Sequence, residues 1–255
     1  MFPTLLNIYG PLAINMYGLM IFIAVIVFTW LLSKDKNIRK FLSLDQISNI
    51  VILGIISGVF GSKILYNLTD QEPLNILKII KFWEGGGSIL GGITLILVII
   101  PIYLKSIKAP VLKTMDQISI YTPLLESISR LGCWFAGCCH GTETTFCLAI
   151  KYTHPDSYAP QGIYLHPTQI YASLSLFLVF LIMLKLSKFL SKPGELISCY
   201  IILTSLQRFL IDFLRGDREY FSLESINFLS IHQWIALGLI TIASAMLLIS
   251  AKRNK

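Results

Sequence analysis

The stretch from Ser129 to Gly141 concentrates side chains that can do chemistry. It reads Ser-Arg-Leu-Gly-Cys-Trp-Phe-Ala-Gly-Cys-Cys-His-Gly, so an arginine, three cysteines and a histidine stand close together along the chain. A guanidinium group binds phosphate through two parallel hydrogen bonds, and thiols act as nucleophiles or as ligands for soft metals. Because the flanking sequence is strongly apolar, Arg130 must be paired or must serve a site.

Other ionisable residues occur at helical spacing in the apolar segments. Glu126 and Arg130 are four residues apart, as are Arg208 and Asp212, and Arg215 follows three residues later. Side chains at these spacings meet on one face of a helix. One interpretation is that Glu126–Arg130 and Arg208–Asp212 are neutralised structural pairs, and the other is that these charges serve a site. Buried charge is avoided unless it is compensated or functional.

Seven apolar segments are long enough to hold these residues in a bilayer. The chain has 255 residues, of which 55% are hydrophobic and only 14% are charged, whereas about 25% are charged in a typical soluble domain. A membrane-spanning helix needs about 20 apolar residues. We expect an all-α integral membrane protein, a single polytopic domain over residues 1–255. Its seven transmembrane helices are expected at about 12–32, 45–66, 88–104, 116–137, 167–186, 195–214 and 231–250.

The basic residues lie in alternate connections between these expected spans. The connections after the first, third, fifth and seventh spans hold more than half of the 21 lysines and arginines, and the others are neutral to acidic. Cytoplasmic loops carry such an excess, so we expect the N-terminus outside and the C-terminus in the cytoplasm. The same distribution argues against nucleic acid as the reason for the net charge of +7. The residues are Lys34, Lys36, Arg39 and Lys40, then Lys105, Lys108 and Lys113, then Lys185, Lys188 and Lys192, then Lys252, Arg253 and Lys255.

This orientation brings the ionisable residues to one side of the membrane. Lys63, Arg130 and Arg215 fall in the outer parts of their segments, with Arg208 somewhat deeper, and His166 marks the outer start of the fifth span. Guanidinium and ammonium groups at one depth form a cationic pocket. Such a pocket, open to the outer leaflet, suits a phospholipid head group.

The cysteines leave two other kinds of chemistry open. Cys133, Cys138, Cys139 and His140 could bind a soft metal, but their spacing matches none of the usual zinc patterns, and adjacent cysteines are an awkward pair for one tetrahedral ion. Cys138, Cys139 and Cys147 lie at or beyond the outer end of the fourth span, and an oxidising outer compartment would favour a structural disulfide among them.

Five glycines lie between Gly85 and Gly92, where the third span begins. Their exposed amides could cradle an anion. Small residues also let membrane helices touch, and both interpretations stay open.

Six motifs, in order along most of the chain, resemble those of the prolipoprotein diacylglyceryl transferases of bacterial plasma membranes. The closest match is His166-Pro-Thr-Gln-Ile-Tyr, which is similar to the family's His-Pro-Ser-Gln-Leu-Tyr almost residue for residue. Six motifs in series are more specific than any one alone. The other five are Asn15-Met-Tyr-Gly-Leu-Met, Gly61-Ser-Lys-Ile-Leu-Tyr, Trp83-Glu-Gly-Gly-Gly-Ser-Ile-Leu-Gly-Gly, the signature from Arg130 to Gly141, and Arg208-Phe-Leu-Ile-Asp-Phe-Leu-Arg-Gly-Asp.

The resemblance implies an activity and a site. The activity is transfer of a diacylglyceryl group from phosphatidylglycerol to the lipobox cysteine of a prolipoprotein, forming a thioether as glycerol phosphate leaves. It implies membrane lipids and prolipoprotein signal peptides as partners, no nucleic acid, no metal or organic cofactor, and a multi-pass protein of the bacterial plasma (inner) membrane with its active site toward the outer leaflet. The expected catalytic residues are Arg130, Arg208, His140 and His166. The expected phospholipid-binding residues are Tyr17, Lys63, Gly91, Gly92, Arg130, Gly141, Gln169, Tyr171, Asp212 and Arg215.

The chain also departs from the family pattern. Leu90 stands where the family has a histidine often assigned an acid–base role, so His140, or else His166, is the expected replacement. Lys63 replaces an arginine, Cys133 an asparagine, Cys138 a glutamate and Asp212 a glutamate.

These departures leave two alternatives. One is a divergent relative with another lipid acceptor, or one that binds lipid without catalysis. The other is a membrane thiol-redox or metal-handling protein that uses the cysteines.

Overall fold

The computed structural model describes residues 3–9, 12–69, 87–221 and 227–252. These separate into two compact units, one made of residues 1–28 and 115–255 and the other of residues 29–114. The motif residues Trp83, Glu84, Gly85 and Gly86 and the basic residues Arg253 and Lys255 lie outside the described residues.

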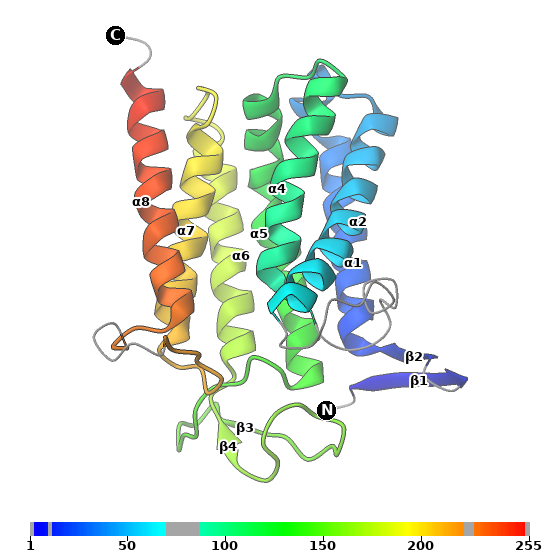
Figure 1. Ribbon diagram of the computed structural model, residues 1–255, viewed down its shortest axis with the longest axis vertical. Coiled ribbons are helices and arrows are strands. Elements are labelled where there is room, and N and C mark those ends of the chain that lie inside the picture. The colour runs from blue at the N-terminus through cyan, green and yellow to red at the C-terminus, as the bar shows by residue number, and fades with distance from the viewer. Residues whose placement is uncertain (1–2, 10–11, 70–86, 222–226, 253–255) are drawn as a thin grey trace. The chain divides into compact units, whose positions relative to one another are not determined.

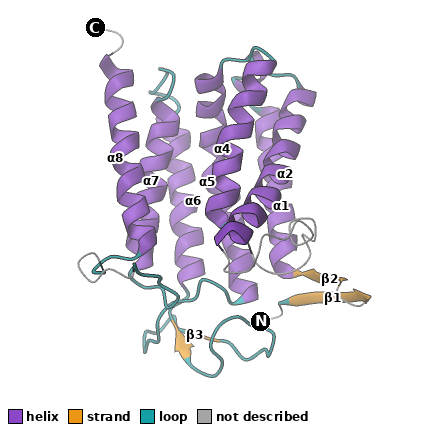
Figure 2. Ribbon diagram, viewed as in Figure 1, coloured by secondary structure: helices purple, strands orange, loops and turns teal. Residues whose placement is uncertain are grey.

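The described residues form helices joined by short connections, with two small hairpins (Figures 1 and 2). The α-helices are α1 (Met16–Lys34), α2 (Leu44–Thr69), α4 (Ile89–Ser106), α5 (Val111–Ala136), α6 (Thr168–Leu186), α7 (Glu195–Asp212) and α8 (Ile231–Lys252). A short 3-10 helix, η1, covers Ile38–Lys40. Strand β1 (Thr4–Tyr9) pairs antiparallel with β2 (Leu12–Asn15), and β3 (Ile150–Lys151) with β4 (Tyr164–Leu165).

The seven α-helices of the described residues begin and end within a few residues of the expected spans. Four of them, α1, α2, α6 and α8, are long and apolar enough to cross a membrane. The apolar segment of helix α4 is shorter than in these four. Helix α5 carries Arg130, and helix α7 carries Arg208 and Asp212. The chain is thus a helical membrane protein.

One detail of the expected fold is corrected. Leu12–Asn15, expected within the first span, is strand β2, because it pairs with Thr4–Tyr9 before α1 begins at Met16. The fold is helical as expected, and the two small hairpins, β1–β2 and β3–β4, are additions that the sequence did not predict.

In the unit that contains α5 to α8, polar contacts and an apolar core join the helices. The Asp116 carboxylate on α5 accepts hydrogen bonds from the amides of Gly194 (2.7 Å) and Ile197 (2.9 Å), which compensates donors at the start of α7 that have no partner within the helix. Ser127 on α5 and Ser173 on α6 donate to each other's backbone carbonyl at 2.8 and 2.9 Å. The apolar cluster between these helices comprises Ile120, Val179, Met183 and Leu196.

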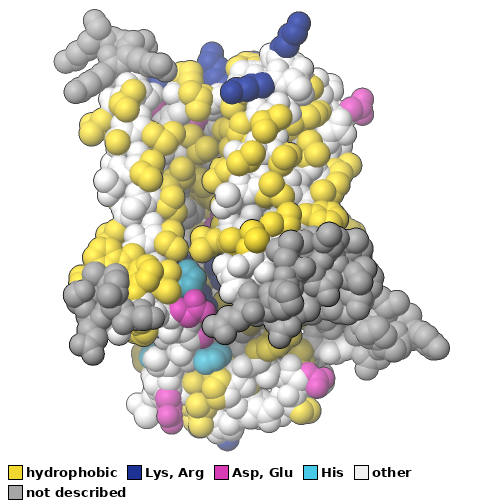
Figure 3. All heavy atoms as spheres, in the orientation of Figure 1, with side chains coloured by type: hydrophobic (Ala, Val, Ile, Leu, Met, Phe, Trp, Pro, Cys, Tyr) yellow, Lys and Arg dark blue, Asp and Glu magenta, His cyan; other side chains and the backbone are white. Residues whose placement is uncertain are grey.

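The two ends of this unit differ in chemistry. The Ser250 hydroxyl near the end of α8 donates to the Pro193 carbonyl (3.1 Å), so the α8 end lies beside the connection that carries Lys188 and Lys192. The hairpin β3–β4 lies at the opposite end, where α6 begins (Figure 1). Between the ends, exposed apolar side chains such as Leu174, Leu178 and Ile242 cover the helices. Hydrophobic side chains dominate the helical part of the face seen in Figure 3.

In the unit that contains α2 and α4, glycines let these two helices touch. A Cβ atom at Gly61 would lie 2.4 Å from the Gly91 carbonyl oxygen, and one at Gly91 would lie 2.2 Å from that of Gly61. Gly92 approaches Gly58 in the same way, at 2.9 Å. The amides of Gly91 and Gly92 donate to the Ser88 carbonyl. These contacts favour the packing interpretation over an anion cradle at Gly91 and Gly92.

Substituting Gly61 tests this helix crossing. Gly61→Ala should lower the free energy of unfolding by about 1–3 kcal/mol, because the added methyl group meets backbone atoms that cannot move aside. Denaturant titration in mild detergent measures the change. The matched control is Gly54→Ala on the same helix, where nothing lies within 4 Å of the added group. Equal stabilities of the two variants would contradict the close crossing.

Candidate functional site

The segment from Ser129 to Gly141 contains the end of α5 and the loop that follows. Helix α5 ends because Gly137 adopts a left-handed conformation (φ +80°) and its amide donates to the Cys133 carbonyl at 2.9 Å. Cys139 is also left-handed (φ +58°), which is uncommon for a residue other than glycine. The chain therefore turns sharply twice and brings Cys138 and Cys139 back over the end of α5.

The loop is held between the start of α6 and the end of α7. The Gly141 amide donates to the His166 carbonyl (3.1 Å), and the Gly216 amide donates to the His140 carbonyl (3.0 Å). A Cβ atom at Gly141 would lie 2.5 Å from His166 Cβ and 2.9 Å from the Leu214 carbonyl oxygen. Gly141, expected to bind phospholipid, is thus the point where three segments meet and only glycine fits.

Three arginines surround one small cavity at this end of the unit. Arg130 comes from α5, Arg208 from α7, and Arg215 from the turn after α7. The cavity has a volume of about 10 Å³, room for about one water molecule. The other lining residues are Cys139, Thr168, Gln169, Ala172, Gln207 and Ile211.

Asp212 compensates part of this charge. Its carboxylate, 1% exposed, lies 3.4 Å from Arg208 Nη2 and 3.6 Å from Arg218 Nε, and it accepts a hydrogen bond from the Ser230 hydroxyl. Arg208 and Asp212 therefore form the ion pair that their spacing allows. Glu126 and Arg130 do not, because Glu126 accepts a hydrogen bond from the Tyr200 hydroxyl and no ion pair joins it to Arg130 in the described part of the chain.

Arg215 has a carboxylate partner of its own. Its guanidinium group donates to both oxygens of Asp217, at 2.7 and 2.6 Å. Burial alone would lower the pKa of Arg215, but the hydrogen bonds that Arg215 donates to Asp217, together with the nearby Cys139, outweigh burial and raise that pKa. Arg215 is thus a permanent cation. Arg130 differs from it, because no carboxylate of the described residues lies within ion-pair distance, and its Nη1 lies 3.9 Å from Cys139 Sγ.

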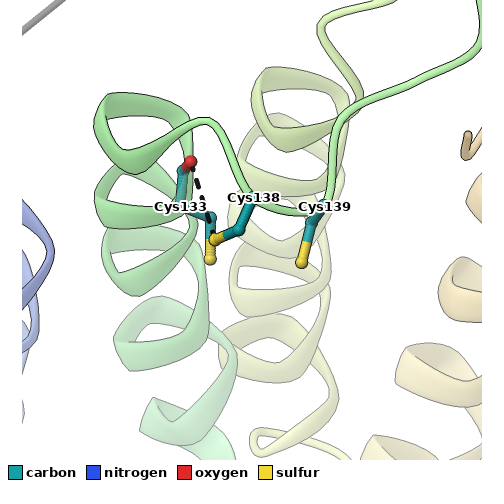
Figure 4. A group of neighbouring side chains, drawn as sticks. All are labelled: Cys133, Cys138 and Cys139. Carbon is teal, nitrogen blue, oxygen red and sulfur yellow. Dashed lines mark hydrogen bonds between the residues drawn. The ribbon is translucent and has the colours of Figure 1, made fainter. Parts of the chain in front are cut away.

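The three cysteines of the segment form a cluster (Figure 4). The Sγ atoms of Cys133, Cys138 and Cys139 lie within 4.8 Å of one another, and Cys138 Sγ lies 3.8 Å from the Cys133 carbonyl oxygen. All five cysteines of the chain are free thiols in this structure. Hydrogen bonds from the other two thiols, with Arg215 and Arg130 nearby, lower the pKa of the Cys139 thiol against the opposing effect of burial.

Gln169 lines the cavity and also contacts the loop after α5. It is 1% exposed, and its Nε2 donates to the Cys138 carbonyl (2.8 Å) and to the Tyr152 hydroxyl (3.1 Å). Its Oε1 has no hydrogen-bond partner among the described residues. Burial raises the pKa of Tyr152, so this phenol stays neutral. The neighbouring Thr168 hydroxyl donates to the Cys139 carbonyl (2.7 Å).

The expected histidines flank the cavity and do not line it. His140 Nδ1 lies 3.0 Å from the Gly141 carbonyl oxygen, which favours the proton on Nδ1 and leaves Nε2 as the acceptor. His166 Nδ1 lies 3.5 Å from the Tyr171 hydroxyl. Tyr17, near the start of α1, packs against Gly132 of α5, where an added Cβ atom would lie 3.1 Å from the Tyr17 carbonyl oxygen.

Three expected site residues belong to the other unit. Lys63 is 6% exposed on α2, and Gly91 and Gly92 form the crossing with α2 described above. Their part in a common site with Arg130 stays a prediction.

Several residues at the site were not expected from the sequence. Gln207 lines the cavity, Tyr200 binds Glu126, and Arg218 pairs with Asp212 and lies over the rings of Phe213 (5.5 Å) and Tyr220 (5.1 Å). Arg218 follows Arg215 by three residues, so the basic pattern could have been extended to it. For Tyr200, 74 residues from Glu126, the sequence offers no local signal.

These features define a class: a helical membrane protein with a cationic cavity at one end of its α5–α7 helices. The sequence model of the family described as prolipoprotein diacylglyceryl transferase matches residues 3–249. The chain belongs to this family.

Individual relatives agree with this assignment. The phosphatidylglycerol–prolipoprotein diacylglyceryl transferase of Clostridium tetani (strain Massachusetts / E88) is 35% identical over 241 residues, 94% of each chain. Transferase 2 of Clostridium perfringens (strain 13 / Type A) is also 35% identical, over 91% of this chain and 88% of its own. The transferase of Clostridium botulinum (strain Langeland / NCTC 10281 / Type F) is 31% identical, over 83% and 84%.

Asp212 is predicted to be the residue on which the stability of this site depends most. Asp212→Ala should lower the free energy of unfolding by about 2–3 kcal/mol, because it leaves two partly buried guanidinium groups without their carboxylate. Asp212→Glu keeps the charge and should cost much less. The control is Asp156→Ala, at a side chain 65% exposed, with an expected loss below about 1 kcal/mol. Similar losses for the two alanine variants, measured by denaturant titration, would refute the role of Asp212.

Proposed function

We propose that this protein transfers a diacylglyceryl group from phosphatidylglycerol to the lipobox cysteine of a prolipoprotein. The acceptor sulfur attacks the glyceryl carbon, the carbon–oxygen bond to phosphate breaks, and glycerol phosphate leaves with the bonding electrons. The relatives above carry this activity in their names. The feature of this chain that supports it best is the cavity between Arg130, Arg208 and Arg215.

The arginines suit the step in which negative charge develops on the leaving phosphate. Arg208 and Arg215 are already paired with Asp212 and Asp217. Arg130 has no carboxylate partner among the described residues, so its donors remain for a phosphate. Charged donors fixed where charge develops are the largest single contribution in many enzymes. We assign phosphate binding, and stabilisation of the charge that develops on the leaving phosphate, to Arg130. Arg208 and Arg215 complete the positively charged lining of the cavity.

The cavity must widen to admit a head group, because it now has room for about one water molecule. Its unpartnered acceptor, Gln169 Oε1, needs a donor. Among phospholipid head groups, the glycerol of phosphatidylglycerol offers hydroxyl donors. We therefore assign head-group recognition to Gln169. Tyr17, Tyr171, Lys63, Gly91 and Gly92 remain proposed contacts of the bound lipid.

The acceptor thiol must lose its proton before or during attack. His140 is our candidate base, because its Nε2 is the acceptor nitrogen and its backbone is tied to the cavity wall through Gly216. His166 is the second candidate, and it lies beside Tyr171.

We also propose the membrane arrangement. The protein spans the bacterial plasma (inner) membrane seven times, with the N-terminus outside, the C-terminus in the cytoplasm and the active site toward the outer leaflet. The separation of the basic α8 end from the cavity end of the same unit supports this orientation.

Complementation tests the function directly. A bacterial strain depleted of its own transferase should grow when this chain is expressed, and mass spectrometry of one of its lipoproteins should show the added diacylglyceryl mass. A correctly inserted, stable protein that adds no such mass would favour a divergent relative with another acceptor.

Arg130 is predicted to contribute more to the turnover rate than any other residue of the site. Arg130→Ala should lower the turnover of the purified enzyme by roughly 10²–10³-fold, the usual cost of removing one fixed donor to a developing anion. Arg130→Lys should recover only part of the lost turnover, since lysine keeps the positive charge but cannot bind phosphate in the bidentate geometry. Lys151→Ala, on the exposed hairpin, controls for net charge. Unchanged lipidation by Arg130→Ala would exclude this assignment.

A further inference from the structure

The connection between α1 and α2, in the unit of residues 29–114, surrounds an open hollow. Ser33 and four basic side chains line this hollow, and its volume is about 400 Å³. Sites for small ligands have volumes of about 300–1,000 Å³. The hollow can therefore hold a lipid head group, whereas the arginine cavity has room for about one water molecule. The four basic residues are Lys34, Lys36, Arg39 and Lys40.

Buried side chains hold this connection in one conformation. Leu32 and Ile38 are fully buried, and Leu42 is nearly so. The Asn37 amide donates to Asp35 Oδ1 (2.7 Å), and the Leu42 amide donates to the Ile38 carbonyl (3.0 Å) across η1. Because the backbone is fixed on both sides of the turn, the four cations project from a defined framework and not from a free chain.

The cations around the hollow have no acidic partner among the described residues. Their four positive charges and the single carboxylate of Asp35 leave a formal charge of +3 over residues 34–40. None of the salt bridges in the described part of the chain includes any of them. Lys40 Nζ donates to the neutral side-chain oxygen of Asn37 (3.2 Å). Since like charges around one hollow repel one another, an anion bound there lowers the electrostatic energy.

The hollow belongs to a basic end of its unit, next to the membrane. It directly follows α1, which is long and apolar enough to cross a bilayer, and the exposed Trp30 near the end of α1 suits the membrane–water interface. The Asn49 side-chain amide of α2 donates to the Tyr103 hydroxyl of α4 (3.2 Å). This contact places Lys105 and Lys108, which follow Tyr103, at the same end of the unit. In the proposed membrane arrangement, this end faces the cytoplasm.

We propose that this hollow binds the phosphate of an anionic phospholipid from the cytoplasmic leaflet. The choice of leaflet rests on the proposed membrane arrangement. The Arg39 guanidinium group can hold a phosphate through two parallel hydrogen bonds, and the three lysines add positive charge around it. Clusters of about four to eight lysines and arginines directly after a membrane helix bind anionic lipids. A zwitterionic lipid gains less, because the same cations repel its ammonium group.

This lipid site shares no residue with the arginine cavity. A lipid in the cavity is a substrate in the proposed function and is consumed. A lipid in the hollow keeps its bonds and neutralises the cations after α1. The protein would therefore bind phosphatidylglycerol in two ways, and the two can be separated by substitution.

Native mass spectrometry of the Arg130→Ala protein in detergent tests the hollow without the cavity. This protein should still retain phosphatidylglycerol, at least tenfold more tightly than phosphatidylcholine. Adding Lys36→Gln and Arg39→Gln should weaken retention at least tenfold, since each cation near an anionic lipid contributes about fivefold. Adding Lys36→Arg, which keeps the charge, should leave retention unchanged. The matched control adds Lys185→Gln and Lys188→Gln, at exposed side chains of another basic connection, and should also leave it unchanged.

Three results would overturn the site. The first is retention that survives Lys36→Gln with Arg39→Gln. The second is an equal loss in the Lys185 and Lys188 control, which would show that overall charge attracts the lipid. The third is inorganic phosphate that binds as tightly as the lipid in calorimetry, which would assign the hollow to free phosphate. Because the protein used lacks Arg130, failure of the proposed transfer reaction would leave these results unchanged.

Discussion

Mutual repulsion among three guanidinium groups, one buried and two partly buried, is the constraint on which this site depends. Arg130, Arg208 and Arg215 line one cavity with room for about one water molecule, and like charges in a medium of low dielectric are costly. Asp212 and Asp217 compensate two of them. The remaining positive charge on Arg130 makes the cavity favourable for an anion. In the proposed reaction, the phosphate of the phospholipid would balance this charge, and Arg130 would then stabilise the leaving phosphate.

The loop after α5 fixes the positions of these charges relative to one another. Gly141 binds His166 at the start of α6 and lies against Leu214 at the end of α7, so residues far apart in sequence are joined through one glycine. Gly137 and Cys139 provide the turns that make this possible. The glycines and the cysteines of this loop therefore have different positions in the site: the glycines shape the backbone, and the three cysteines place their thiols close together, with Cys139 beside Arg130.

Much of this could be predicted where the interaction is local. The helix positions follow from runs of apolar residues, and Arg208–Asp212 follows from a spacing of four within one helix. Glu126 and Arg130 share that spacing, yet Tyr200 from α7 takes the carboxylate, because packing between helices decides between competing partners. The hairpins and the cysteine cluster could not be predicted for a related reason. They depend on pairing with distant backbone and on a left-handed residue that local spacing does not specify.

The most direct test of the cationic cavity is which lipid the protein retains. Purified wild type and Arg130→Ala would be equilibrated with equal amounts of phosphatidylglycerol and diacylglycerol in detergent and examined by native mass spectrometry. If the phosphate is held by Arg130, the wild type retains phosphatidylglycerol in preference, and the variant loses that preference at least tenfold, since hydrogen bonds to charged groups contribute about 1.5–3 kcal/mol. Equal preference in the two proteins would contradict this account of the site.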